Sequence, residues 1–441
     1  MRQSLNLVAL VLAQALVGDA LPQSRGLERR RGPEFSEGQP VDGKGKGARI
    51  MGGTNRQIDL QNPDNLGQQS TDAGVVPNLK WSFSDSKTRI LKGGWVREQV
   101  ITDLPSSHDI AGAQQHLTKG SIRELHWHRV AEWGFVYNGS VLISAVDEFG
   151  RYQDETLNFG DIWYFPKGVA HTVQGLDDDN EFLLVFDEAD FDKIGTTFNV
   201  DDWVAHTPKD VLAKNFGLDP KVFDSVPSPN PYITEADVST KSVTGAPTGS
   251  ELTGDASFVY RTLQHEPEPA PGSGGVFYKI DSTNFPVSKT IAATFVTLKP
   301  GGLRELHWHP NAEEWLYFHS GTGRATVFIG NGAARTFDFR SGDTAAFPDN
   351  SGHYIENTSE TEDLVWIEIY KSDRVADISL TQWLALTPAD IVAQTLKIPI
   401  DIAEGLKKEK QLLIQQSAST SASPSSASST ASSATAASTS A

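Results

Sequence analysis

The chain has 441 residues, with 56 Asp or Glu against 38 Lys or Arg, a formal net charge of −18, and no cysteine. This length provides for two or more domains with sizeable cores. The acidic balance argues against nucleic acid and against an anionic membrane surface as partners. The missing cysteine excludes disulfides, thiolate metal ligands and cysteine nucleophiles.

The N-terminal part has the features of an export signal followed by a leader. Met1 and Arg2 precede an apolar run, LNLVALVLAQALV, and small residues follow, a pattern typical of a secretory signal peptide over residues 1–20. Residues 21–69 are rich in Gly, Arg, Gln and Asp, which predicts a disordered or cleaved leader. We therefore expect a secreted protein, extracellular or associated with the cell wall, without a membrane anchor.

A long internal repeat organises the rest of the chain. The stretch GSIRELHWHRVAEWGFVYNG at 120–139 returns as GGLRELHWHPNAEEWLYFHSG at 301–321, with its Arg-Glu-Leu-His-Trp-His at an offset of 181 residues. Short runs rich in β-branched and aromatic residues surround both copies and are broken by Gly and Asp, which predicts a small antiparallel barrel or sandwich in each. A similar helical pattern, beginning at Trp203 and at Trp383, ends each copy.

The repeat and the composition together predict the domain boundaries. We expect a first domain over residues 70–230, a linker rich in Pro, Ser, Thr and Gly over 231–254, and a second domain over 255–416. A tail of Ser, Thr and Ala at 417–441 is typical of a flexible, O-glycosylated stalk. Asn138 and Asn357 begin N-glycosylation sequons, so the protein is predicted to be a glycoprotein.

Each repeat contains residues that can bind a metal ion. Residues two apart in a strand point to the same face, so His126 and His128 converge, and a short turn brings Glu132 in from the next strand. The second copy supplies His307, His309 and Glu314 in the same way. Two imidazoles and a carboxylate from adjacent strands predict a metal site with open positions.

A third histidine completes each predicted ligand set. His171 and His353 follow the first histidine of their copy by 45 and 46 residues, and this difference matches the one extra residue before Glu314. Six of the eleven histidines thus occupy matching positions in the two repeats, which argues against chance surface histidines. Three nitrogen ligands and one oxygen ligand suit Mn(II), Fe(II), Ni or Cu(II).

These motifs resemble those of the cupin family. The glycines, histidines and glutamate of both repeats fit the first cupin motif, and the segments ending near His171 and His353 fit the second, although Gly175 stands where the second copy has Asn357. The repeated RELHWH, followed by AEW or EEW, is similar to the bicupin oxalate decarboxylases. The resemblance implies an all-β fold of two tandem cupin barrels, the jelly-roll or double-stranded β-helix, each followed by a short helical unit. It also implies two Mn(2+) ions per chain, oxalate and dioxygen as reactants, and allows a homo-oligomer.

Two arginines are candidates for binding the substrate. Arg123 and Arg304 each precede the first histidine of their site by three residues, and a guanidinium presents a planar fork that matches a carboxylate. Strict alternation would place Arg123 on the face opposite His126, so this role requires a bulge in the strand. The alternative is a structural arginine in a salt bridge. The match to the family's substrate arginine favours the functional role.

The resemblance also directs attention to the source of a proton. In the family, an acid that protonates carbon gives formate, and without it the reaction ends in hydrogen peroxide; the acid is a glutamate on a lid in the first module. Here the matching loop, DKIGTT at 192–197, offers only Asp192. Glu368 matches the family's glutamate in the second module and is either a proton donor or a buried partner of Arg304. We expect Glu368, Arg123, Arg304 and Asp192 to be catalytic, with formate depending mainly on Glu368.

Several functions remain open at this stage. The first choice is a secreted manganese-dependent oxalate decarboxylase, because the arginines and Glu368 are retained. The altered lid makes an oxalate oxidase, giving carbon dioxide and hydrogen peroxide, the main alternative. Another metal-dependent bicupin dioxygenase would keep the ligands but would not need paired arginines. A seed-storage-like bicupin would have lost the ligands that both repeats keep.

Overall fold

The computed structural model describes residues 70–415. The predicted signal peptide, leader and Ser/Thr/Ala-rich tail lie outside these residues. Within the described part, no helix has both the length and the apolar character needed to cross a membrane.

Each repeat folds into two antiparallel sheets. In the first repeat, one sheet has the order β14-β9-β6-β11-β4-β3-β2 and the other has the order β12-β5-β10-β7-β8, with β13 also paired to β5. The strands are β2 Arg89–Leu91, β3 Gly94–Gln99, β4 Ala111–Thr118, β5 Ile122–His128, β6 Glu132–Asn138, β7 Val141–Val146, β8 Tyr152–Leu157, β9 Asp161–Phe165, β10 Ala170–Gly175, β11 Asp179–Phe186, β12 Thr197–Asn199, β13 Ile233–Thr234 and β14 Val259–Arg261.

The second repeat has the same plan, with sheet orders β1-β21-β18-β23-β16-β15 and β20-β19-β22-β17-β24, and with β25 also paired to β17. Its strands are β1 Lys80–Ser82, β15 Gly275–Ile280, β16 Ala292–Leu298, β17 Gly302–Trp308, β18 Glu314–Ser320, β19 Thr322–Gly330, β20 Ala333–Arg340, β21 Asp343–Phe347, β22 Gly352–Asn357, β23 Leu364–Tyr370, β24 Ile378–Ser379 and β25 Leu413–Gln415. The predicted all-β fold of two tandem barrels is confirmed.

The strand β11 shows how the sequence pattern builds two cores at once. Phe182 and Leu184 point into the core of the first barrel. Leu183 and Val185 point into another hydrophobic core, which also contains residues of the second repeat. Because successive side chains of a strand face opposite sides, a strand buried on both faces must be apolar throughout. Hydrogen bonds also cross between the repeats, among them those from Trp315 Nε1 to Gln99 Oε1 at 2.7 Å and from Gln114 Nε2 to Tyr317 Oη at 2.7 Å.

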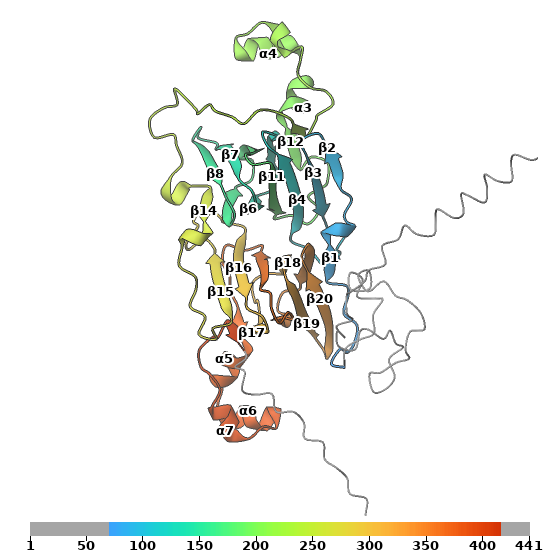
Figure 1. Cartoon of the computed structure of the whole chain (residues 1–441), viewed down its shortest axis with the longest axis vertical. Coiled ribbons are helices and arrows are strands. Elements are labelled where there is room, and N and C mark those ends of the chain that lie inside the picture. The colour runs from blue at the N-terminus through green and yellow to red at the C-terminus, as the bar shows by residue number, and fades with distance from the viewer. Residues whose placement is uncertain (1–69, 416–441) are drawn as a thin grey trace, which may run out of the picture. The chain divides into compact units, whose positions relative to one another are not determined.

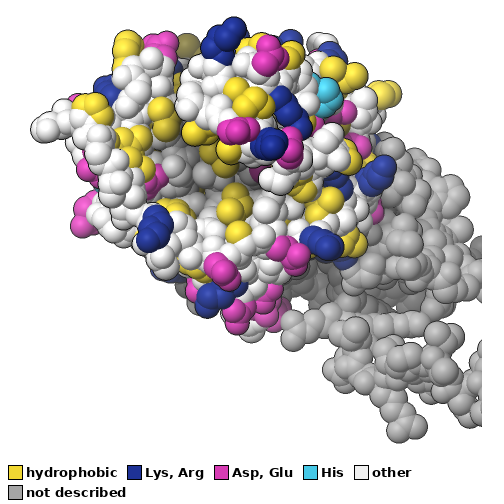
Figure 2. Space-filling model, turned by 90° about the horizontal axis from the view of Figure 1, so that it is seen from above, with side chains coloured by type: hydrophobic (Ala, Val, Ile, Leu, Met, Phe, Trp, Pro, Cys, Tyr) yellow, Lys and Arg dark blue, Asp and Glu magenta, His cyan; other side chains and the backbone are white. Residues whose placement is uncertain are grey.

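Helices follow the strands of each barrel, as the sequence predicts (Figure 1). In the first repeat α3 contacts β5 and β12, and in the second α5 contacts β17 and β24. The face that carries α3 and α4 shows hydrophobic side chains among charged ones (Figure 2); Trp203 on α3 is 66% exposed. The bounds are α3 Val200–Ala205, α4 Lys209–Phe216, α5 Leu380–Ala385, α6 Ala389–Leu396 and α7 Ile400–Glu404.

The two repeats exchange edge strands. Strand β1, which precedes the first repeat, pairs with β21 of the second, and β14, which lies within the predicted second domain, pairs with β9 of the first. Strand β13, from the predicted linker, pairs with β5. Segments from outside each repeat thus complete both barrels, because strand pairing can recruit a short segment from either side of a domain boundary. The boundaries at residues 70, 231 and 255 stay predictions.

A buried ion pair anchors the exchanged strand β1. Lys80 Nζ lies 2.8 Å from Asp343 Oδ2, and the two side chains are 1% and 0% exposed. Removing one partner leaves the other charge without compensation in the interior, so we expect Lys80→Met to lower the free energy of unfolding by about 3–5 kcal/mol. Denaturant unfolding measures this change.

The matched control is Lys209→Met. Lys209 pairs with Asp224 at 2.5 Å, but both side chains are more than half exposed, so the loss should stay below about 1 kcal/mol. Equal losses in the two variants would show that the Lys80 pair does not anchor the strand.

Candidate metal centres

A bulge in β5 places an arginine on the same side as the first histidine. His126 pairs with His171 on β10, and Arg123 pairs with Val173, so three steps on β5 face two steps on β10. The extra residue cancels the alternation that would separate Arg123 from His126. Strand β17 has the same irregularity between Arg304 and His307. The bulge that a role for these arginines requires is thus present in both repeats.

The first four predicted ligands form a buried cluster. His126, His128, Glu132 and His171 each present one ligand atom, and these atoms all lie within 4.8 Å of one another. Glu132 Oε2 is 3.0 Å from His128 Nε2 and 3.3 Å from His171 Nε2. Strands β5, β6 and β10 supply these side chains, so the site is built from both sheets of the barrel.

The second cluster repeats this arrangement. His307, His309, Glu314 and His353 also bring one ligand atom each within 4.8 Å of one another, and all four are buried. Glu314 Oε2 is 2.7 Å from His353 Nε2 and 3.4 Å from His309 Nε2. The structure therefore brings together both predicted three-histidine, one-glutamate sets.

Hydrogen bonds at the far side of each ring orient the imidazoles. In five of the six histidines, Nδ1 faces a backbone carbonyl, which can only accept; the sixth, His128, has Nδ1 3.0 Å from Thr197 Oγ1. In those five, Nδ1 therefore carries the proton and Nε2 directs a lone pair into the cluster, as metal-binding histidines require; the hydroxyl of Thr197 can accept from His128 in the same way. The five carbonyls belong to Glu124, Val169, Glu305, Ala376 and Ser351.

The protonation states suit a divalent cation. Burial, together with the arginine three residues earlier, lowers the pKa of His126 and of His307 well below its usual value. Burial also lowers the pKa of His128 to about 4. Burial alone would raise the pKa of Glu132, but His171 and His128 bring it well below its usual range. Neutral imidazoles and an ionised carboxylate are the forms that bind metal.

Unsatisfied atoms point to the same use of the clusters. His307 Nε2 and both carboxylate oxygens of Glu314 are buried without a hydrogen-bond partner. Buried polar atoms almost always have a partner, so ligand atoms aimed at one point fit a bound cation. The donor set of each cluster thus accepts a divalent metal ion.

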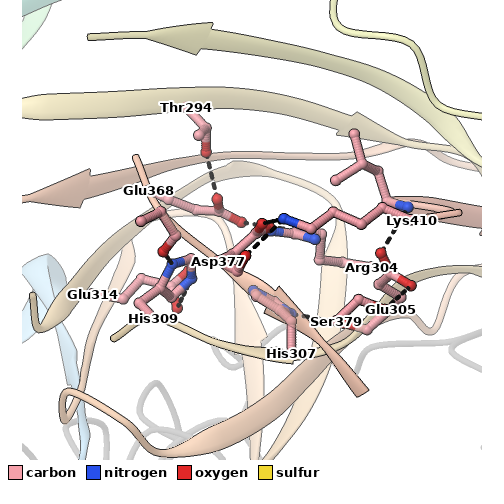
Figure 3. Close-up of polar contacts among 12 residues, drawn as sticks. Thr294, Arg304, Glu305, His307, His309, Glu314, Glu368, Asp377, Ser379 and Lys410 are labelled. Carbon is pink, nitrogen blue, oxygen red and sulfur yellow. Dashed lines mark hydrogen bonds and ion pairs between the residues drawn. The ribbon is translucent and has the colours of Figure 1, made fainter. Parts of the chain in front are cut away.

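In the second barrel, Glu368 accepts hydrogen bonds from three side chains, one of which is Thr294 (Figure 3). Its side chain is fully buried; Oε1 accepts from Trp366 Nε1 at 3.0 Å, and Oε2 accepts from Tyr370 Oη at 2.9 Å and from Thr294 Oγ1. Such a set of donors stabilises a carboxylate in the interior. Glu368 is therefore a fully engaged side chain.

Arg304 is neutralised by two carboxylates. Its Nη2 donates to Asp377 Oδ2 at 2.7 Å, and its Nε is 3.8 Å from Glu368 Oε1. Lys410 forms a second ion pair with Asp377 (Figure 3). Burial alone would lower the pKa of Arg304, but Asp377 and Glu368 raise it above its usual value. The guanidinium that was a candidate for binding substrate is already part of a buried ionic network.

Arg123 has a different environment. Its Nη1 donates to Asn199 Oδ1 at 3.3 Å, its guanidinium lies 3.8 Å from the centre of the Tyr232 ring, and its contact with Glu124 Oε1 is longer, at 3.6 Å. Burial and a hydrogen bond with Asp201 raise the pKa of Glu124 to about 7. The first barrel therefore holds its arginine mainly by an amide and an aromatic ring.

The stretch of β11 that faces the first cluster is apolar. Glu132 pairs with Phe186 on β11, and Glu314 pairs with Tyr370 on β23, so these two positions correspond. Two residues earlier on each strand, Leu184 stands where the second barrel has Glu368. The first barrel thus lacks the polar side chains that engage the arginine of the second.

The loop with Asp192 borders a cavity beside the first cluster. Asp192 is exposed, and Thr197, at the end of the loop, contacts His128 Nδ1. The cavity has a volume of about 510 Å³. It is lined by Arg89, Glu98, Phe191, Asp192, Lys193, Ile194, Gly195, Thr197, Asn199, Asp202, Pro229, Asn230 and Tyr232.

Nothing in the sequence pattern points to Glu98, Thr197, Asn199 or Tyr232. Tyr232 lies in the predicted linker, and its counterpart before β25 is Leu412, so the repeat gave no signal for it. A shared backbone feature links the two positions, since both have positive φ, 65° and 55°. That feature is visible only in the structure.

Comparisons with known proteins agree with this site. Residues 83–224 and 265–400 match the family described as Cupin. The chain is 60% identical to a probable oxalate decarboxylase of Arthroderma benhamiae, over 92% of this chain and 98% of that protein. It is 44% identical to an oxalate decarboxylase of Bacillus subtilis, over 86% and 98%.

Solved structures of the Bacillus subtilis oxalate decarboxylase are similar as well. The structure at pH 4.6 has a TM-score of 0.80 and 44% identity and covers 86% of this chain and 98% of that one. A second structure, with the same TM-score and identity, covers 86% and 99% and belongs to work on the Mn(II) centres of that enzyme. With its repeated motifs, its paired barrels and its two buried clusters, the chain belongs to the cupin family, among the bicupin oxalate decarboxylases.

Proposed function

We propose that the protein is a secreted, manganese-dependent oxalate decarboxylase that converts oxalate to formate and carbon dioxide with dioxygen as a catalytic cofactor. The observation that carries this proposal is Arg123 beside the first ligand cluster. Its planar fork is suited to one carboxylate of a small dicarboxylate whose other carboxylate is at the metal. Family membership and the manganese centres of the Bacillus subtilis relative support the choice of substrate and metal.

The residues of the first barrel have distinct tasks in this proposal. His126, His128, Glu132 and His171 would hold the ion, which supplies Lewis-acid and redox chemistry to substrate and dioxygen when bound. Arg123 orients the far carboxylate, and Asn199 and Tyr232 keep its guanidinium in place. The apolar wall of Leu184, Phe186 and Phe191 excludes water and strengthens these charge interactions.

We assign substrate turnover to the first barrel. In the second barrel, Asp377 and Glu368 already offset the charge of Arg304, so its Nε and Nη1, which have no hydrogen-bond partner, would attract a substrate carboxylate less strongly than Arg123 does. The hydrogen bonds of Glu368 support the role of a buried partner of Arg304 rather than that of a proton donor. They therefore argue against the prediction that formate depends mainly on Glu368. The second cluster would then hold a metal ion without binding substrate through Arg304.

An oxalate oxidase is the second candidate, and the loop at 192–197 is the observation that favours it. The loop contains no glutamate, and Lys193 is paired with Asp190. If no acid delivers a proton to carbon, peroxide replaces formate as the product. Measuring formate and hydrogen peroxide from the same oxalate reaction separates the two functions.

Glycosylation stays a prediction, and the structure distinguishes the two sequons. Asn138 is exposed at the end of β6. Asn357 is 1% exposed, and its Nδ2 donates to the carbonyls of Leu298 and Glu362 at 2.9 and 2.8 Å. A glycan on Asn357 would replace one of the two amide hydrogens that make these bonds and would have to fit at a buried position, so Asn138 is the accessible acceptor.

The two clusters predict metal content. Protein supplied with manganese should bind two ions per chain. His128→Ala and His309→Ala should each remove one ion, because each variant loses one ligand of a separate cluster. Elemental analysis measures the stoichiometry. A wild-type value that stays at one would show that one cluster does not bind metal.

The two arginines should respond differently to the same substitution. Arg123→Lys keeps the charge but loses the two-pronged geometry, so the KM for oxalate should rise about tenfold or more, as expected for the loss of a charge-assisted hydrogen bond. Arg304→Lys should lower stability and leave the KM nearly unchanged. Steady-state kinetics and thermal unfolding measure both effects. The reverse pattern would place the substrate in the second barrel.

A further inference from the structure

Glu98 lies on the inner wall of the first barrel. On β3 it pairs with Ala113 of β4, which pairs in turn with Leu184 of β11. Residues paired across a sheet point to the same face, and Ala113 and Leu184 belong to the core inside this barrel. Glu98 therefore projects to the side of the sheet that faces the metal cluster, where a carboxylate among apolar neighbours is costly.

The same row of the second barrel explains why Glu98 stands out. There Lys279 pairs with Thr294, and Thr294 pairs with Glu368 and donates a hydrogen bond to it. In the first barrel, the carboxylate of this row is Glu98 on β3, two strands away from Leu184, which occupies the position of Glu368. Ala113, in the place of Thr294, has no hydroxyl to donate. Glu98 is thus a carboxylate on the barrel wall, and Ala113 cannot donate to it the hydrogen bond that Thr294 donates to Glu368.

The cavity beside the loop joins Glu98 to the other residues of the first site. Glu98 and Asp192 both line it, and so does Tyr232, which carries the guanidinium of Arg123 on its ring. Arg89 also lines the cavity and lies over the same ring at 4.7 Å. One cavity is therefore lined by the carboxylates of Asp192 and Glu98 and by Tyr232, the ring that supports Arg123.

The charges around Glu98 favour its protonated form. Burial and the neighbouring carboxylate of Asp192 raise the pKa of Glu98 above its usual value, and Asp103 adds to this effect. Arg123 and Arg89 act in the opposite direction without cancelling the rise. A carboxyl group that keeps its proton at mildly acidic pH is suited to general acid catalysis.

We infer that Glu98 is the proton donor of the first barrel and takes the place of the glutamate missing from the loop. This inference rests on the proposed function. As the carbon–carbon bond of oxalate breaks, carbon dioxide leaves and the electron pair remains on the carbon held by Arg123. That carbon takes the proton of Glu98 and becomes formate. The Glu98 carboxylate regains a proton from solvent through Asp192, so that oxalate and one proton give formate and carbon dioxide.

The test compares three variants of the full-length, manganese-loaded protein. Glu98→Gln keeps the shape and removes the acid, Glu98→Asp keeps the acid on a shorter arm, and Glu181→Gln changes a glutamate on β11. Glu181 is the control because its side chain alternates with that of Phe182 and points away from the barrel interior. The readouts are metal content, the ratio of formate to peroxide, and the infrared band of protonated carboxyl groups at mildly acidic pH.

We expect Glu98→Gln to lose part of the protonated-carboxyl band and to lower the ratio of formate to peroxide at least tenfold, with metal content unchanged. Glu98→Asp should restore part of the ratio, and Glu181→Gln should match the wild type in every readout. If the wild type yields formate and Glu98→Gln keeps the same ratio or the same band, the inference is wrong and the proposed function stands. A wild type that leaves oxalate untouched would overturn both.

Discussion

A buried guanidinium next to a cation site must be stabilised, and the way each barrel meets this requirement decides what its metal cluster can do. A charge removed from water is costly unless it is paired or otherwise compensated. The second barrel pairs Arg304 with Asp377 and Glu368, whereas the first holds Arg123 with Asn199 and the ring of Tyr232. The carboxylate nearest to Arg123 is Glu124, at 3.6 Å, and its pKa is raised to about 7. At mildly acidic pH it therefore offsets little of the charge with which Arg123 attracts an anion.

This difference turns two similar ligand sets into two different sites. The histidines have the same Nδ1 supports in both barrels, apart from the hydroxyl of Thr197 at His128. That contact couples a ligand of the first cluster to the loop at 192–197, which borders the cavity. The protein as a whole is strongly acidic, so an anionic substrate would have to be attracted locally, and Arg89 and Arg123, which both lie over the ring of Tyr232, can supply that attraction.

Much of the fold and the eight residues of the two clusters could be predicted from the sequence, because strand alternation and the spacing of the histidines and glutamates appear in both repeats. The exchanged strands β1 and β14 could not, since short segments carry little information on their pairing. The structure also explains why Gly175 stands where the second repeat has Asn357. Asn180 Nδ2 donates to Leu117 O as Asn357 Nδ2 donates to Leu298 O, and a Cβ at Gly175 would lie 2.6 Å from the Asn180 amide. The role of Glu98 likewise depends on which strands pair.

The central claim is that the first cluster, and not the second, binds oxalate. The most direct measurement is Mn(II) electron paramagnetic resonance of His128→Ala and His309→Ala, each loaded with one ion, during an oxalate titration without dioxygen. We expect the spectrum of His309→Ala, which retains the first cluster, to change with oxalate, and that of His128→Ala to stay the same. A change confined to His128→Ala would contradict the account.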